Sequence, residues 1–200
     1  MTSTEAATLR QDGRLARSAR TRRAIVDALR SLHHDGDLRP TAPRVAERAG
    51  VSLRTVWQHF TDLETLLVEA GRRDYEIAMR YVIPIDTNAA LPRRLQELVV
   101  QRGRMYEALA PVWRAAMLQE PFSPQIRRNR DRLLSAARDQ LTRVLGRELD
   151  ALPADRRDAT FAALQVATGW STWESLRRDL EMSVEAAEQA VFELVERLMT

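Results

Sequence analysis

The sequence contains no cysteine and no lysine, and only 6% of its residues are aromatic. The absence of cysteine excludes disulfide scaffolds, thiolate zinc sites and cysteine nucleophiles. No run of about 18 apolar residues occurs, and residues 1–11 hold no apolar segment, so we expect neither a membrane span nor a secretory signal. These absences predict a cytoplasmic protein that does not contact a membrane.

The basic residues are unevenly distributed along the chain. All 31 of them are arginines, whose side chain is well suited to bidentate contact with phosphates and guanine edges. Residues 1–60 hold 11 arginines against 6 acidic residues, whereas residues 61–200 hold 20 against 22. A GC-rich genome is one explanation for the missing lysine, but it does not explain this asymmetry.

The pattern of apolar residues predicts an all-α fold. At 200 residues, with 44% hydrophobic and 30% charged residues, the chain has the composition of a folded globular protein. No stretch alternates polar and apolar residues over several positions, as a half-buried strand does. Pro111 is expected to kink or restart one helix. The helices that we expect from periodicity, caps and prolines are 14–32, 42–49, 53–59, 62–83, 91–110, 126–149, 154–181 and 183–199.

Three helix starts fall within residues 41–61. Thr41 is a candidate N-cap before Pro43, Ser52 is a second, and Thr61 with Glu64 forms the T-x-x-E capping box of a third helix. The first two helices are short and meet at Gly50. An arrangement of two short helices around a glycine-containing turn predicts a helix-turn-helix, since an ordinary bundle hairpin needs neither the polar outer face nor the local arginine excess.

The same segment resembles a known family. Residues 46–67 read AERAGVSLRTVWQHFTDLETLL, which resembles the N-terminal signature of the tetracycline-repressor-like (TetR) family of bacterial transcription regulators. The matching positions are Ala46, Ala49, Gly50, Val51, Ser52, Trp57, His59 and Phe60. The resemblance implies a flexible tail at 1–13, a three-helix DNA-binding domain at 14–62, and a helical ligand-binding and dimerisation domain at 63–200.

The resemblance also implies which side chains meet DNA. Arg54, Thr55 and Gln58 are expected to face the major groove, with the other members of the set near the phosphate backbone. The full expected set is Thr41, Arg44, Ser52, Arg54, Thr55, Trp57, Gln58 and His59. Two positions depart from the family pattern, because Trp57 replaces its common tyrosine and no cation occurs at 61–66, where the family often has a lysine. The arginines at 17, 20, 22 and 23 form either a DNA-contacting arm or a solvated face.

Catalytic and metal chemistry have few candidate residues. His33 and His34 with Asp35 and Asp37 resemble a metal cluster, but they end a helix, where histidines are explained by charge pairing with the helix dipole. Beyond His59 the chain has no histidine, and it has no glycine-rich phosphate loop. We therefore expect no catalytic site, no metal and no cofactor, and a protein that is not an enzyme.

Methionine and aromatic residues of the second half have two interpretations: core packing, or the lining of an apolar cavity. The resemblance favours a cavity, because members of the family hold a small-molecule inducer between the middle helices. Arg102, Arg104 and Gln101 are candidates to orient a polar or acidic ligand. The predicted ligand-binding residues are Met105, Trp113, Met117, Phe122, Trp170 and Trp173.

The last two expected helices carry more apolar residues than a chain of this size needs at its end. In the family, this pair forms a four-helix interface with a second copy, and two-fold symmetry places two recognition helices about 34–36 Å apart. The sequence therefore predicts a homodimeric repressor that binds double-stranded DNA at a palindromic operator and is released by a small molecule of unknown identity. The alternative is a helical scaffold that binds partners without reading DNA.

Overall fold

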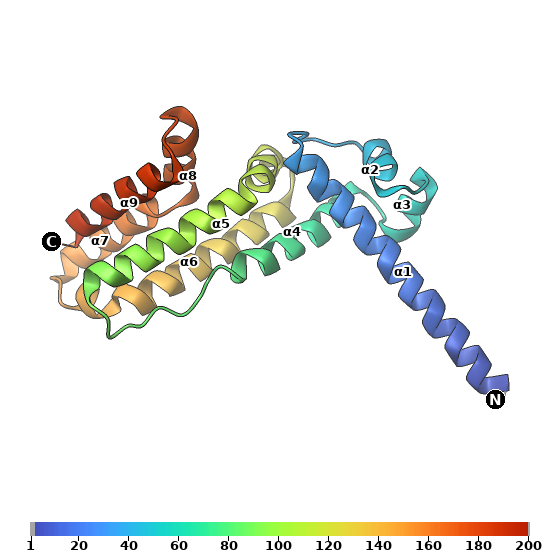
Figure 1. Ribbon diagram of the computed structural model, residues 1–200, viewed down its shortest axis with the longest axis horizontal. Coiled ribbons are helices and arrows are strands. Elements are labelled where there is room, and N and C mark those ends of the chain that lie inside the picture. The colour runs from blue at the N-terminus through green and yellow to red at the C-terminus, as the bar shows by residue number, and fades with distance from the viewer. Residues whose placement is uncertain (1–2, 200) are drawn as a thin grey trace. The chain divides into compact units, whose positions relative to one another are not determined.

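The computed structural model describes residues 3–199, with side chains from residue 13 onward. Every regular element in that range is helical, which confirms the all-α expectation (Figure 1). The chain forms two compact units. The first contains the chain up to Asp74 together with Pro111–Arg127, and the second contains Tyr75–Ala110 and the chain from Arg128 onward.

The first unit contains the predicted helix-turn-helix. Its first helix begins at Ser3, ahead of the start at Arg14 that the apolar spacing predicts, because residues 3–13 continue the same helix. The segment Pro111–Arg127 adds the end of one helix, a short 3-10 turn and the start of the next. The elements of this unit are α1 (Ser3–His34), α2 (Ala42–Ala49), α3 (Leu53–His59), α4 (Leu63–Met79) up to Asp74, the end of α5 (Leu91–Gln119), η1 (Glu120–Phe122) and the start of α6 (Pro124–Asp150).

Apolar residues at helical spacing form the core of the first unit. Ile25 and Leu29 of α1 are fully buried, as the i, i+4 pattern predicts. They belong to one cluster with Val45 of α2 and with Val56 and Phe60 at α3, each at most 1% exposed. Because this cluster joins every helix of the helix-turn-helix, the outer face of α3 is held in a defined orientation.

The turn between α2 and α3 follows the expected chemistry. Gly50 ends α2 in the left-handed conformation, at φ 65° and ψ 33°, and its N–H bonds back to the last turn of α2. Ser52 caps α3, because its hydroxyl accepts a hydrogen bond from Thr55 N at 3.1 Å. Thr41 occupies the N-cap position of α2, but its side chain makes no capping hydrogen bond.

The predicted capping box of α4 is wrong. Asp62, rather than Thr61, caps the helix, since its Oδ1 accepts from Thr65 N at 2.7 Å. The hydrogen bonds that Asp62 accepts from the backbone N–H and from the side chain of Thr65 hold the pKa of Asp62 below its ordinary value. Glu64 instead accepts from the Ser123 hydroxyl at 2.6 Å, within the same unit. A carboxylate adjacent to the helix start therefore displaces the two-residue box.

The second unit is a bundle that contains the remainder of α4, α5 and α6. Its further elements are α7 (Ala154–Ala167), α8 (Trp170–Glu174), a π-helical turn (Ser175–Asp179) and α9 (Val184–Leu198), with α7 beside α9 (Figure 1). The prediction of a single continuous helix at 154–181 is wrong, because the helix is interrupted at Gly169. There a Cβ atom would lie 2.9 Å from Gln165 O. In contrast, α5 continues through Pro111 to Gln119 without restarting.

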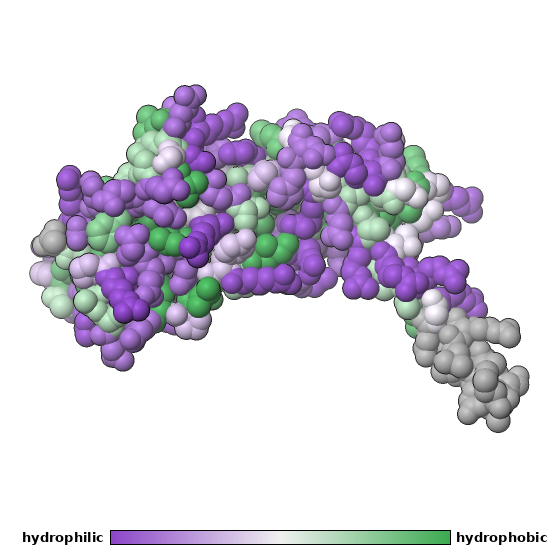
Figure 2. Space-filling view, in the orientation of Figure 1, coloured by the Kyte–Doolittle hydropathy of each residue, from purple (hydrophilic) through white to green (hydrophobic). Residues whose placement is uncertain are grey.

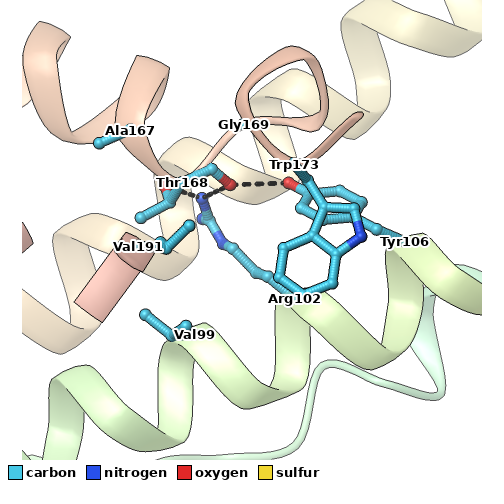
Figure 3. A pocket seen from close by; sticks show the side chains of 8 residues that line it. All are labelled: Val99, Arg102, Tyr106, Ala167, Thr168, Gly169, Trp173 and Val191. Atoms are coloured by element: carbon cyan, nitrogen blue, oxygen red, sulfur yellow. Dashed lines mark hydrogen bonds between the residues drawn. The ribbon is translucent and has the colours of Figure 1, made fainter. Parts of the chain in front are cut away.

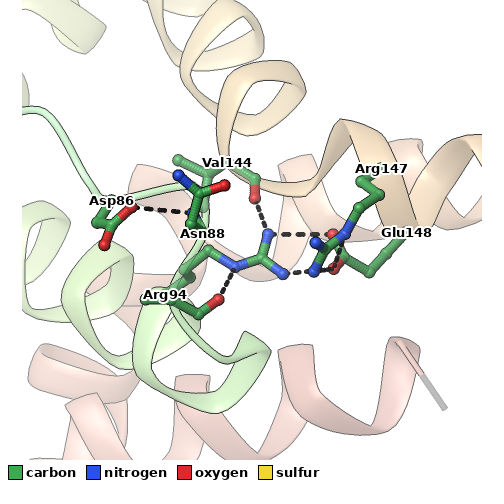
Figure 4. A network of polar contacts seen from close by, with 7 residues as sticks. Asp86, Asn88, Arg94, Val144, Arg147 and Glu148 are labelled. Carbon is green, nitrogen blue, oxygen red and sulfur yellow. Dashed lines mark hydrogen bonds and ion pairs between the residues drawn. The ribbon is translucent and has the colours of Figure 1, made fainter.

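Arg94 joins α5 to α6 in the core of the second unit (Figure 4). Its side chain is 1% exposed and donates to the carbonyls of Ala89 and Val144 and to both carboxylate oxygens of Glu148. These hydrogen bonds, first that from Arg94 and then that from Arg147, lower the pKa of Glu148 to about 2. The buried positive charge thus has a fully ionised partner near neutral pH.

Hydrophilic side chains cover most of the face seen in Figure 2. Hydrophobic residues are scattered among them. Among the hydrophobic residues of the later helices, Val166, Leu180 and Leu194 are 69%, 64% and 44% exposed. Over the part of the chain that the structure describes, no helix is both long and apolar enough to cross a membrane.

Candidate nucleic-acid interface

Helix α3 presents a polar face to solvent and an apolar face to the core. Val56 is fully buried, whereas Arg54 and Gln58 are exposed and Trp57 is 42% exposed. No acidic residue occurs between Arg48 and Thr61. An exposed helix with a guanidinium, an amide and an aromatic ring, and without carboxylates, has the chemistry that reads base edges and contacts phosphates.

Ser52 and Thr55 at the start of α3 are already engaged with each other. Their hydroxyl oxygens lie 2.8 Å apart, in addition to the capping hydrogen bond from Thr55 N to Ser52. Their positions are consequently fixed, and each hydroxyl retains further hydrogen-bonding capacity because a hydroxyl donates once and accepts twice.

The end of α3 is held by an arginine of α1. Arg22 donates to the carbonyl of His59 at 2.5 Å and to Glu69 of α4 at 3.3 Å. Its guanidinium carbon also lies 4.3 Å from the centroid of the Phe60 ring, a cation–π distance. Arg22 therefore holds the end of α3 in place, whereas Arg17, Arg20 and Arg23 are exposed on α1.

The two arginines of α2 pair with the end of α1 and the loop that follows it. Arg44 lies 2.5 Å from a carboxylate oxygen of Asp37, and Arg48 lies 2.6 Å from Asp35. Arg48 also donates to the Ser31 hydroxyl at 2.5 Å. These pairs hold α2 against α1. A phosphate at Arg44 would have to compete with Asp37.

His33 does not act as the dipole-paired cation that its position suggests. Its side chain is 3% exposed, and burial lowers its pKa to about 4, so the ring is neutral near pH 7. The interpretation of His33 as a positive charge at the end of α1 is therefore wrong. Within the described residues, no group of three histidine, aspartate or glutamate side chains is arranged to hold a metal ion.

A small pocket lies in the second unit (Figure 3). Its free volume is about 10 Å³, roughly the room that one water molecule needs. Thr168 and Gly169, where the helix is interrupted after α7, form part of the pocket wall. The interruption of the helix places them there. The lining residues are Val99, Arg102, Tyr106, Ala167, Thr168, Gly169, Trp173 and Val191.

Of the six residues predicted to bind a ligand, Trp173 lines this pocket. Trp170 lies next to it, with its ring centroid 5.8 Å from that of Tyr106. Met105 is half-buried on α5. Trp113, Met117 and Phe122 belong to the first unit, where Met117 is 53% and Phe122 81% exposed. The six predicted residues are thus divided between the two units.

Sequence reasoning missed the role of Arg22 and the pocket residue Thr168. No local signal distinguishes Arg22 from the neighbouring arginines of α1, because its partners are His59 and Glu69, 37 and 47 residues away. The Thr168–Gly169 pair did carry a signal, since an isolated glycine in a helical pattern can end a helix.

Comparison with solved structures identifies the architecture. The chain superposes on a transcriptional regulator from Rhodococcus sp. Rha1 with a TM-score of 0.68 and 20% identity, over 90% of this chain and 95% of that one. A second Rhodococcus sp. protein, assigned to the TetR family of transcriptional regulators, matches with a TM-score of 0.70 and 17% identity, over 90% and 100%. The chain has the TetR-family fold. The resemblance carried by residues 46–67 is thus confirmed at the level of the fold.

A third protein of this fold is the multidrug binding protein EbrR, solved in complex with imidazole. It matches with a TM-score of 0.64 and 22% identity, over 88% of each chain. No protein-family model and no curated protein matches the sequence.

Proposed function

We propose that the protein is a sequence-specific DNA-binding transcriptional regulator, a homodimeric repressor that a small-molecule ligand releases from its operator. The observation that carries the proposal is the outer face of α3, where Arg54, Trp57 and Gln58 are exposed above a fully buried Val56. A bundle helix has no need of an acid-free, hydrogen-bonding outer face. The proposal assigns no enzymatic activity to the chain.

In this proposal the predicted DNA residues have separate roles. Arg54 and Gln58 read base edges in the major groove, while Trp57, Thr41 and the His59 side chain lie at the phosphates. Ser52 and Thr55 orient the start of α3. Through their remaining hydrogen-bonding capacity, Ser52 contacts the DNA phosphate backbone and Thr55 faces the major groove. Arg44 contacts a DNA phosphate after its ion pair with Asp37 has separated.

The test of this function is fluorescence anisotropy with the full chain at two salt concentrations. The duplexes are the region upstream of the protein's own gene, fragments selected from genomic DNA, and scrambled controls. We expect one native duplex to bind about a thousandfold more tightly than its scrambled version. Both duplexes should weaken with salt, because phosphate contacts release counterions.

A helical scaffold is the second candidate, and the ion pair between Arg44 and Asp37 favours it, since this arginine is already partnered. A scaffold would bind all duplexes equally and weakly, including those that emerge from selection. That result would contradict the regulator proposal.

The exposed apolar residues of the last helices support dimerisation. Val166 on α7, Leu194 on α9 and Leu180 before α9 are 69%, 44% and 64% exposed, and α7 and α9 pack side by side. We expect sedimentation to show a dimer at micromolar concentration, and the double variant Val166→Glu/Leu194→Glu to be a monomer, because charges at the centre of an interface are costly.

The matched control is Leu134→Glu on α6, a leucine that is 47% exposed. It should remain dimeric. A wild-type monomer at micromolar concentration would contradict both the interface and the expectation of a palindromic operator.

A further inference from the structure

Two buried arginines of α5 differ in how their charge is compensated. Arg94, 1% exposed, pairs with the carboxylate of Glu148. Arg102, 5% exposed, has only neutral partners among the described residues. Its Nε donates to Gln140 Oε1 at 3.2 Å, its Nη1 to the carbonyl and hydroxyl of Thr168, and its Nη2 to the carbonyl of Ala137 at 2.8 Å.

These neutral acceptors compensate the charge of Arg102 only in part. Thr168 caps the C-terminal end of α7, where the helix dipole adds some negative potential. One N–H of Nη2 has no acceptor among these partners, and burial holds the pKa of Arg102 below its ordinary value. A buried guanidinium without a carboxylate favours an anion that can enter its surroundings.

The walls around Arg102 combine one cationic end with an apolar body. Val99 and Val191 line the pocket together with Ala167 (Figure 3). The rings of Tyr106 and Trp173 lie with their centroids 6.1 Å apart, and the Tyr106 hydroxyl donates to Thr168 O at 2.8 Å. A pocket with one charged group in an apolar lining selects ligands that are amphipathic.

Trp173 forms part of the pocket wall and is 3% exposed. Its ring packs on the backbone at Gly103, where an added Cβ would lie 2.7 Å from it. It belongs to α8, a helix of five residues between the break at Gly169 and a π-helical turn. The indole N–H donates to Glu107 Oε1 at 2.8 Å. A ring on so short and irregular a segment can move without unfolding a long helix.

We propose that this pocket binds an organic monoanion with an apolar body, such as a medium-chain carboxylate, with its carboxylate on Arg102 and its chain in the space that Trp173 vacates. As the class of the releasing ligand, this inference rests on the proposed function. As a binding site, it rests on Arg102 and the lining alone.

The test compares octanoate with octanamide, which has the same chain and no charge, by isothermal titration of the full-length protein. We expect octanoate to bind at least tenfold more tightly than octanamide. Arg102→Gln should remove this preference, while Arg102→Lys, which keeps the charge, should retain part of it. Arg93→Gln, an arginine near the start of the same helix whose side chain is 74% exposed, is the control and should bind as the wild type does.

The wild-type comparison remains decisive if Arg102→Gln fails to fold. Equal binding of octanoate and octanamide, or no binding of either, overturns the proposal, and so does an undiminished octanoate preference in folded Arg102→Gln. The anisotropy experiment separates this inference from the proposed function. Specific DNA binding without octanoate binding rejects the ligand class alone, whereas octanoate preference without DNA binding supports the site and rejects the regulator.

Discussion

Replacing Arg94 with methionine is expected to lower the free energy of unfolding by about 3–5 kcal/mol. The side chain is 1% exposed, and its removal leaves the carbonyls of Ala89 and Val144 without their donor and Glu148 without its buried counter-charge. Methionine fills much of the same volume, so the loss reports the polar contacts rather than a cavity. Urea denaturation followed by circular dichroism measures it.

The control is Arg93→Met, at the neighbouring position of α5. Its side chain is 74% exposed and pairs with Glu97 at 2.9 Å, so the expected loss is much smaller, because exposed ion pairs contribute little to stability. Equal losses in the two variants would show that the buried network contributes no more than a surface pair.

The same network gives a pH dependence of stability. Arg94 lowers the pKa of Glu148 from 4.5 to about 2, so the folded state holds the proton less tightly than the unfolded state does. The stabilisation is therefore complete above about pH 4.5 and is lost as the pH falls towards 2. In Arg94→Met, the decrease in stability over that window should be smaller than in the wild type.

Replacing Arg54 with alanine is expected to weaken binding to the native operator by about 5–150-fold, which corresponds to 1–3 kcal/mol. Arg54 is exposed in the first turn of α3 and has no hydrogen-bond or ion-pair partner among the described residues, so its substitution disturbs no internal contact. Scrambled duplexes should bind nearly as well as before. Fluorescence anisotropy on both duplexes measures the difference.

The matched control is Arg132→Ala, an exposed arginine of α6, which should change neither affinity. If Arg54→Ala weakened native and scrambled duplexes by the same factor, Arg54 would contact phosphate instead of reading guanine. The salt dependence would then fall by about one unit.

Much of the fold was accessible from the sequence because helix periodicity and capping are local. The i, i+4 spacing of Ile25 and Leu29, Gly50 after α2 and Ser52 before α3 each act within a few residues. The errors arose where two local signals competed. At α4, Asp62 and Thr61 both offered a capping oxygen, and at Gly169 a periodic pattern continued across a break.

The sequence by itself determined the all-α class, the helix-turn-helix and which residues α3 exposes, because these depend on spacing along one helix. Only the tertiary structure decided which arginines make contacts within the folded protein. Arg22, Arg94 and Arg102 look alike in sequence, yet they hold α3, pair with Glu148 and line a pocket, respectively. Apart from Ala89, which is close to Arg94 in sequence, their partners lie 35 to 66 residues away, and groups so distant in sequence meet only after the helices have packed.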